Sequence, residues 1–215
     1  MMTRYFILIL VLLSTDPIWA LSVSLNPTEW MTISYPKINA NTVKQAQDGL
    51  HIFVNNSSSA QVYKFEKPIS LKEVKIKAHI KGEIKYGLKI PGSKQADDFP
   101  LRLGFILKGK NKLNFFQKAI APDWLIELNS MSSKFGGLDK VYSLIFYTTK
   151  PNFKKREHPF SSYFFEQVGG SFKNSKLDEI YKLSIKNEVI GLWLSSDGDD
   201  TNSSFEVIVE SIDIN

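Results

Sequence analysis

The sequence predicts an all-β protein: a jelly-roll-type β-sandwich of about ten strands with one or two short helices. Three observations lead to this prediction. Short stretches of alternating apolar and polar residues recur through most of the 215-residue chain, separated by turns rich in Gly, Pro and Asn. Only one segment has sustained helical spacing, and no internal repeat is present. Hydrophobic residues make up 43% of the chain, which suffices for one sizeable core.

Residues 1–20 have the three parts of an export signal. Arg4 stands near the start, an apolar run covers residues 5–13, and Ala20 offers a small residue at which to cleave. The apolar run is too short to cross about 30 Å of hydrocarbon. We therefore expect an exported chain, periplasmic or secreted, in which residues 21–215 form a single β-sandwich domain without a transmembrane segment.

The first half of the chain predicts strands with one long interruption. Residues 43–54 contain a turn signal at Asp48-Gly49, and residues 61–65 follow a polar loop. Residues 72–81 alternate most clearly, which predicts a half-buried strand with a basic outer face. Residues 82–100 have no sustained period and predict a long loop or mobile flap. The alternating strand places these residues on its two sides: Val74, Ile76, Ala78 and Ile80 inside; Lys75, Lys77, His79 and Lys81 outside.

The second half adds the helical segments and the closing strands. Helical spacing of apolar residues over 122–135 predicts a helix, with Pro122 in its first turn and Gly136-Gly137 at its end. Residues 176–183 are expected to form a second, shorter helix. The remaining apolar or alternating stretches are predicted strands: 101–107, 141–148, 162–168, 189–194 and 205–214.

Charge is distributed unevenly along the chain. The formal net charge is +5, but residues 64–118 carry fourteen Lys and Arg against five Asp and Glu. Residues 188–215 carry seven acidic residues and no basic one. The chain has no cysteine, which excludes disulfides and a thiolate nucleophile or ligand. We expect an electrically lopsided protein stabilised by apolar burial.

Three segments in one order resemble an exported bacterial family, domain-of-unknown-function family 3047. They are Asp97-Asp98-Phe99 with Arg102, the strand 141–147, and the segment 190–201. The family's pattern prefers Asn at the position of Asp200. Its middle strand is richer in Trp than this one, which has Ser143 and Phe146. The resemblance implies a sandwich similar to carbohydrate-binding modules, and it implies no activity and no catalytic residue.

Asp97, Asp98 and Arg102 form the first candidate binding group. Asp98 and Arg102 would lie about 13 Å apart along one strand, too far for a direct ion pair. Arg102 must therefore find a carboxylate across the sheet or in the loop folding back, because an unpaired guanidinium among apolar residues is costly to bury. We predict a structural Arg–carboxylate bridge, with a substrate-binding Arg as the alternative. Adjacent strand residues point to opposite faces, so Asp97 and Asp98 are a poor catalytic pair.

A basic stripe of Lys75, Lys77 and Lys81 is the second candidate binding group. It could hold an anionic polysaccharide or another anionic envelope component. The alternative is a solvated face whose lysines discourage aggregation. Nucleic acid is not expected, because Lys lacks the planar fork of Arg and few aromatic residues are interleaved for stacking.

The acidic loop near the C-terminus is the candidate metal site. Asp197, Asp199, Asp200 and Asn202 place four oxygen-bearing side chains within six residues, and calcium takes six to eight oxygen ligands. The spacing is not that of the helix-flanked calcium loop, so the alternative is an Asp-Gly turn with solvated acids. Calcium, if bound, would brace the loop. No other cofactor is expected, and the three histidines lack zinc-ligand spacing.

These features leave three hypotheses of function. The first is an exported non-catalytic sandwich that binds carbohydrate or an envelope component. The second is a secreted jelly-roll hydrolase or lyase acting on polysaccharide, for which Glu127, Glu166 and Tyr163 are the residues to test. The third is a periplasmic structural or assembly protein. The motifs of serine hydrolases and zinc proteases are absent, so no catalytic residue is predicted. Trp124 and Trp193 lie in apolar runs and are predicted core residues.

Overall fold

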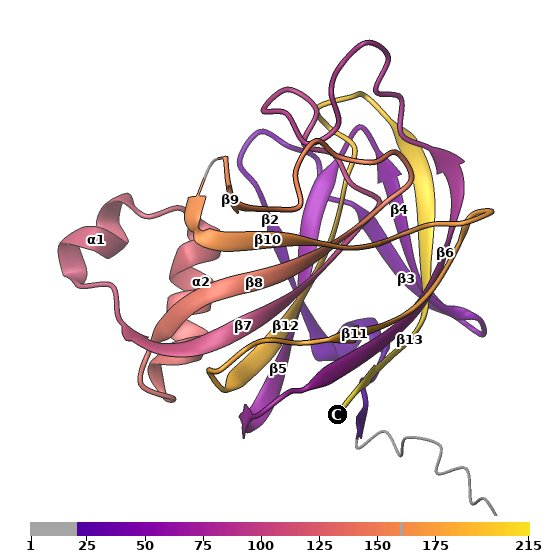
Figure 1. Ribbon diagram of the computed structural model, residues 1–215. Coiled ribbons are helices and arrows are strands. Elements are labelled where there is room, and N and C mark those ends of the chain that lie inside the picture. The colour runs from indigo at the N-terminus through magenta and orange to yellow at the C-terminus, as the bar shows by residue number, and fades with distance from the viewer. Residues whose placement is uncertain (1–20, 160) are drawn as a thin grey trace, which may run out of the picture.

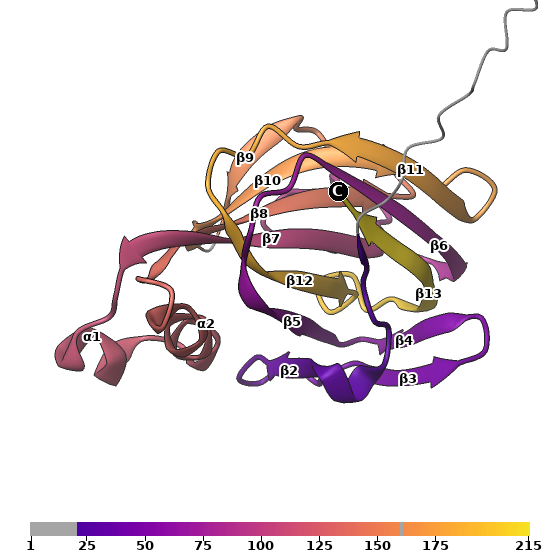
Figure 2. The same cartoon turned by 90° about the horizontal axis from the view of Figure 1, so that it is seen from below.

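The computed structural model describes residues 21–159 and 161–215. Thirteen strands in these ranges form two sheets that pack face to face (Figure 1). Figure 2 separates the two layers and shows both α-helices on the outer side of the seven-stranded sheet. The predicted jelly-roll-type β-sandwich is confirmed. The predicted signal over residues 1–20 lies outside the described residues.

The strands follow a mixed order along the chain. In spatial order the six-stranded sheet contains β11 (Lys176–Lys182), β6 (Glu73–Glu83), β13 (Ser204–Ile214), β4 (Gly49–Asn55) and β3 (Thr42–Ala46), with β1 (Leu21–Ser22) also paired to β13. The seven-stranded sheet contains β2 (Trp30–Ser34), β5 (Ser58–Ile69), β12 (Val189–Asp197), β7 (Leu101–Asn111), β8 (Leu138–Tyr147), β10 (Ser161–Ser171) and β9 (Lys155–His158). The pair β8–β10 is parallel, and the other described pairs are antiparallel.

The main core lies between the two sheets and is built by strand alternation. Leu101, Leu103 and Phe105 project from β7 into this core and are fully buried. Val74 and Ile76 meet them from β6, as the alternation of residues 72–81 predicts. Since every second residue of β7 points inward, the intervening positions are left for the outer face of the seven-stranded sheet. Arg102 occupies one of these positions.

A second core lies on that outer face under α2 (Asp123–Ser133). Leu125, Leu128 and Met131 bury one side of the helix against Val141 and Trp193. The helix was predicted at 122–135, and Pro122 stands at its N-cap, where the missing amide hydrogen costs nothing. Two glycines with φ of 109° and 135° follow the helix, as its predicted end requires. The helix therefore covers part of the sheet and leaves the rest open.

The helices differ from the sequence predictions. The expected helix at 176–183 is wrong, because β11 forms there and pairs with β6. The apolar residues at 177, 180 and 181 also fit helical spacing, but the strand buries Leu177 and leaves Ile180 exposed. The short helix α1 (Phe115–Ile120) was not anticipated. A 3-10 turn, η1 (Pro27–Glu29), lies directly before β2. The predicted long loop before β7 is present, and two of its side chains, Tyr86 and Phe99, are buried in the body of the protein.

None of the helices in the described ranges is long and apolar enough to span a membrane.

Candidate functional site

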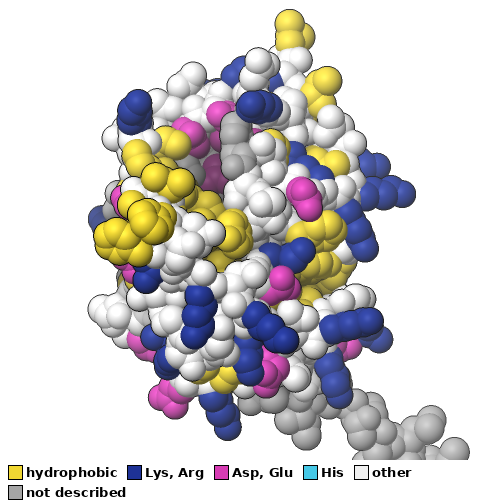
Figure 3. Space-filling view, turned by 90° about the vertical axis from the view of Figure 1, so that its left-hand side faces the viewer, with side chains coloured by type: hydrophobic (Ala, Val, Ile, Leu, Met, Phe, Trp, Pro, Cys, Tyr) yellow, Lys and Arg dark blue, Asp and Glu magenta, His cyan; other side chains and the backbone are white. Residues whose placement is uncertain are grey.

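A cavity of about 390 Å³ opens on the outer face of the seven-stranded sheet, beside the first turn of α2. Figure 3 looks onto this side of the molecule and shows acidic side chains recessed in a hollow in its upper part. Four aromatic residues line the cavity: Tyr35, Trp124, Phe164 and Trp193. Six carboxyl groups also line it: Asp97, Asp98, Glu166, Asp197, Asp199 and Asp200. The other polar lining residues are Ser58, Arg102, His158, Ser161 and Ser195.

Three of these aromatic residues, Trp124, Phe164 and Trp193, form a continuous wall. The ring of Phe164 lies 5.2 Å from that of Trp124 and 5.0 Å from that of Trp193, in tilted and T-shaped contacts. Trp193 is held on β12 opposite Gly104, where a Cβ would lie 3.0 Å from the Cβ of Trp193. Because Trp193 is almost fully buried whereas Trp124 and Phe164 are half-buried, the wall has a fixed base and two accessible rings. Both tryptophans pack in the second core, as predicted, but both also face the cavity.

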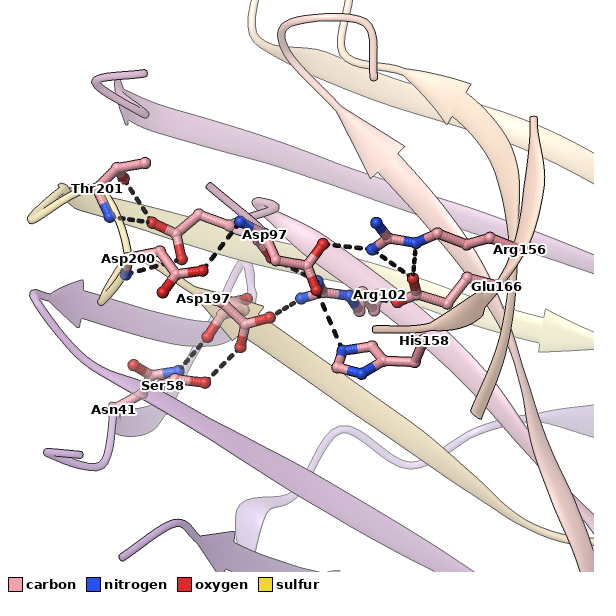
Figure 4. A network of polar contacts seen from close by, with 12 residues as sticks. Asn41, Ser58, Asp97, Arg102, Arg156, His158, Glu166, Asp197, Asp200 and Thr201 are labelled. Carbon is pink, nitrogen blue, oxygen red and sulfur yellow. Dashed lines mark hydrogen bonds and ion pairs between the residues drawn. The ribbon is translucent and has the colours of Figure 1, made fainter. Parts of the chain in front are cut away.

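Arg102 is the centre of a buried ion network beside this wall (Figure 4). Its Nε lies 3.0 Å from Oε1 of Glu166 on β10, and its Nη1 contacts Asp197 at the end of β12. Its Nη2 donates to the backbone carbonyl of Asp97 at 2.6 Å. The guanidinium also lies over the ring of Phe99. The predicted structural Arg–carboxylate bridge is therefore present, and its partners come both from across the sheet and from the returning loop.

Strand β9 closes the network from the other side. Arg156 donates through Nε to Glu166 at 2.6 Å and contacts the carboxylate of Asp97. Nε2 of His158 lies 3.2 Å from Oδ2 of the same aspartate. Because β9 pairs with β10, the guanidinium of Arg156 turns inward against two buried carboxylates.

The second aspartate of the pair, Asp98, ties two loops together. Its carboxylate accepts from the backbone and hydroxyl of Thr201, at 2.7 and 2.5 Å, and from the amide of Asp200 at 3.2 Å. In return, Oδ2 of Asp200 accepts from the amide of Asp97 at 3.0 Å. The loop before β7 and the loop before β13 thus form the rim of the cavity as one unit. Asp97 and Asp98 face different partners, as expected for adjacent residues.

Burial and neighbouring charges shift the pKa values of the aspartates at the cavity in opposite directions. Burial alone would raise the pKa of Asp97, but Arg102, His158 and Arg156 outweigh it and hold that pKa below its ordinary value. Burial raises the pKa of Asp98 in spite of its hydrogen bonds from Thr201. Burial, together with the nearby Asp98, also raises the pKa of Asp199. Asp97 is therefore ionised at neutral pH and is unsuited to donate a proton.

Three polar groups in the cavity remain available to a ligand. Ser195 is 3% exposed and lines the cavity, yet its hydroxyl makes no hydrogen bond within the described residues. The Asp199 carboxylate forms no ion pair in the same ranges. The hydroxyl of Tyr35 makes no hydrogen bond there either. Burial raises the pKa of this hydroxyl, while Arg102 opposes the rise and Asp199 adds to it. Buried polar groups are normally hydrogen-bonded, so these groups favour a ligand with hydroxyl donors and acceptors.

The structure brings together some of the candidate residues and separates others. Asp97, Asp98 and Arg102 meet the acidic loop of Asp197, Asp199 and Asp200 at the cavity. The basic stripe lies on the other sheet, where Lys77 pairs with Asp178 at 3.8 Å and Lys81 with Glu206 at 3.3 Å. Lys75 faces Ile180 and Asp213 across the same sheet. The two candidate binding groups therefore do not form one surface.

The acidic loop is braced by the protein's own hydrogen bonds. Asp197 accepts from Ser58 at 2.5 Å and contacts Arg102, while Asn202 is exposed at φ 50°. Within the described ranges, three metal-type ligand atoms converge within 4.8 Å only at Asp97, His158 and Glu166. Two guanidinium groups face those carboxylates and would repel a cation. Calcium at the acidic loop stays a prediction.

Replacing Asp200 by alanine is expected to lower the free energy of unfolding by about 1–2 kcal/mol, because the Asp97 amide loses its acceptor. Asp199→Asn is the matched control and should be nearly neutral, since that carboxylate forms no ion pair in the described structure and its hydrogen bond is to its own backbone. Thermal unfolding of both variants measures the difference. The same experiment with added calcium tests the ion: a Tm of the unmodified protein that does not change with calcium would contradict calcium binding.

Several site residues were not predicted as such. Glu166 was named only for the enzyme hypothesis, and Tyr35, His158 and Phe164 were not named as site residues. The alternation of Phe164 and Glu166 was a usable signal, because it places both on one face of a strand. No sequence signal brings Tyr35 to that face, because it follows β2, which reaches β12 only through β5.

Comparisons with known proteins add the following. No family model matches the chain, and no curated protein sequence does. Among solved structures, the chain is similar to a xylan-binding module, CBM15, at 10% identity and a TM-score of 0.40, over 90% of this chain and 94% of that one. It is similar to the family 11 carbohydrate-binding module of the cellulosomal cellulase Lic26A-Cel5E of Clostridium thermocellum, at 15% identity and a TM-score of 0.38, with the same coverage. Such values identify no ligand-binding side chain, and membership of family 3047 stays a prediction.

Proposed function

We propose that the protein is an exported, non-catalytic β-sandwich that binds carbohydrate in the cavity beside α2. One observation carries the proposal: a wall of aromatic rings shares the cavity with polar side chains that bond to no other residue of the described chain. Sugar rings present apolar C–H faces and a rim of hydroxyls. Half-buried Trp124 and Phe164 suit the faces, and Ser195 and Asp199 suit the hydroxyls.

The charge of the cavity favours a neutral sugar. Six carboxyl groups line it, whereas two guanidinium groups, from Arg102 and Arg156, lie in the network. Both guanidinium groups already face carboxylates, so neither is free to bind an anionic sugar. An acidic polysaccharide would bring further negative charge into a partly buried site, where repulsion is weakly screened. We therefore infer a preference for neutral over uronic-acid-containing glycans.

A glycan array that pairs neutral and acidic polysaccharides tests this function. The expected result is binding to at least one neutral glycan, with weaker or no signal for its uronic-acid counterpart. Isothermal titration with the selected oligosaccharide then gives the affinity. Failure of every neutral glycan to bind would contradict the proposal, and preferential binding of acidic glycans would contradict the charge argument.

A polysaccharide hydrolase or lyase is the second candidate. It is favoured by the approach of Asp97, Glu166 and His158 within 4.8 Å, next to Arg102 and Tyr35. Two facing carboxylates are what a glycosidase needs. Here, however, both carboxylates are held by guanidinium groups, and Glu127 and Tyr163 do not line the cavity. Release of reducing ends or unsaturated products from a bound glycan, abolished by Glu166→Gln, would support the enzyme.

A further inference from the structure

The short helix α1 carries an exposed apolar tip. Phe115, Phe116 and Ile120 are 81%, 79% and 87% exposed, and no residue of the helix is buried. Figures 1 and 2 show α1 standing away from the body of the sandwich. A capping box between Asn114 and Gln117 forms the helix in place of core packing. This helix of six residues therefore exposes three large apolar side chains to solvent, and an exposed apolar patch of this kind indicates a binding surface.

The chain segment that carries the tip is basic. Lys110 and Lys112 precede the helix, Lys118 lies within it, and no Asp or Glu occurs from residue 99 to residue 122. Figure 3 shows several Lys and Arg side chains, with some Asp and Glu among them, below the hydrophobic side chains on this side of the molecule. The combination of aromatic and aliphatic residues with lysines is that of interfacial membrane anchors.

A second cavity, of about 300 Å³, lies between α1, α2 and the end of β7. Its polar lining residues are Lys110, Asn111, Lys112, Gln117, Asn129 and Tyr163, and none of its lining residues is acidic. Asn129 is 4% exposed. Its Oδ1 accepts from the amide of Leu113 at 2.7 Å, while its amide nitrogen makes no hydrogen bond within the described part of the chain. The cavity therefore offers two ammonium groups and a buried amide donor to an anion.

We propose that this surface docks on an anionic phospholipid bilayer. The side chains of Phe115, Phe116 and Ile120 enter the boundary between headgroups and acyl chains, and a lipid phosphate binds between Lys110 and Lys112. A second copy of the chain fits less well, because three side chains on a convex six-residue helix supply far less than the roughly 800 Å² per partner of a stable protein interface. The proposal does not depend on carbohydrate binding.

The absence of cysteine gives a site-specific test. Ala119→Cys, exposed on α1, is labelled with an environment-sensitive fluorophore, and Leu88→Cys, exposed in the loop before β7, is the matched control. Both full-length proteins share residues 1–20, so any binding by that segment acts on both. With vesicles of phosphatidylglycerol and phosphatidylcholine, a blue shift is expected at position 119 and not at position 88. An unchanged emission at position 119 overturns the proposal.

Variants separate the apolar and the charged contributions. Phe115→Ser with Phe116→Ser should weaken vesicle binding at least about tenfold. Lys110→Ala and Lys112→Ala should each weaken it about fivefold. Vesicles of phosphatidylcholine alone should bind more weakly, and equal binding would overturn the role of the lysines. A blue shift without vesicles that grows with protein concentration would assign the surface to a second copy instead.

Discussion

Replacing Arg102 by methionine is expected to lower the free energy of unfolding by about 3–5 kcal/mol. The side chain is 5% exposed, and its guanidinium faces carboxylates of Asp97, Glu166 and Asp197. Removing it leaves these carboxylates buried with only Arg156 and His158 to offset them. Lys77→Met is the matched control, because that lysine is only partly buried and its pair with Asp178 is worth less than about 1 kcal/mol.

The deficit of Arg102→Met should shrink as the pH falls. In the unmodified protein the folded-state pKa of Asp97 is depressed below its unfolded value, so its contribution to stability is present above the unfolded pKa and is lost as the pH falls through the folded pKa. Without the guanidinium, the folded-state pKa rises and protonation relieves the buried charge. Urea unfolding of both proteins from neutral pH to pH about 4 measures this. A deficit that grows with acid would contradict the network's electrostatic role.

Replacing Trp124 by alanine is expected to weaken carbohydrate binding about thirtyfold, or about 2 kcal/mol. The ring lies half-buried at the cavity and contacts Phe164 at 5.2 Å. A stacked sugar would lose its largest apolar contact. Titration calorimetry with the glycan selected on the array measures the change.

Phe135→Ala is the matched control for that experiment. Phe135 is also half-buried and packs on the second core, but it does not line the cavity. The two variants should lose comparable stability, and only Trp124→Ala should lose affinity. Equal losses of affinity would show that the effect comes from the second core as a whole.

Residue patterns predicted the parts of the fold that depend on local periodicity. The alternation of Val74, Ile76, Ala78 and Ile80 and the helical spacing after Pro122 both describe single faces, and both are confirmed. The helix expected over residues 176–183 was wrong, because Leu177, Ile180 and Tyr181 fit a helix while pairing with β6 decides the outcome. Pairing with a strand far away in the sequence cannot be recognised from the pattern of seven residues alone.

The need for an ion pair at the site could be predicted from the sequence, but the residues that form it could not. A buried arginine requires a carboxylate, which predicted a bridge at Arg102 before its partners were known. The identity of those partners depends on strand order: Glu166 reaches Arg102 across β8, and Arg156 comes from β9 at the sheet edge. Binding by Lys75, Lys77 and Lys81 stays a prediction, and charges counted along the chain could not show that Lys77 and Lys81 pair with Asp178 and Glu206 on neighbouring strands.

A crystal structure of the protein with its selected neutral oligosaccharide tests the central claim most directly. The expected result is a sugar ring stacked on Trp124 or Phe164, with hydroxyls bonded to Ser195 and Asp199. A glycan bound on the basic stripe of Lys75, Lys77 and Lys81, or anywhere else outside the cavity, would contradict it.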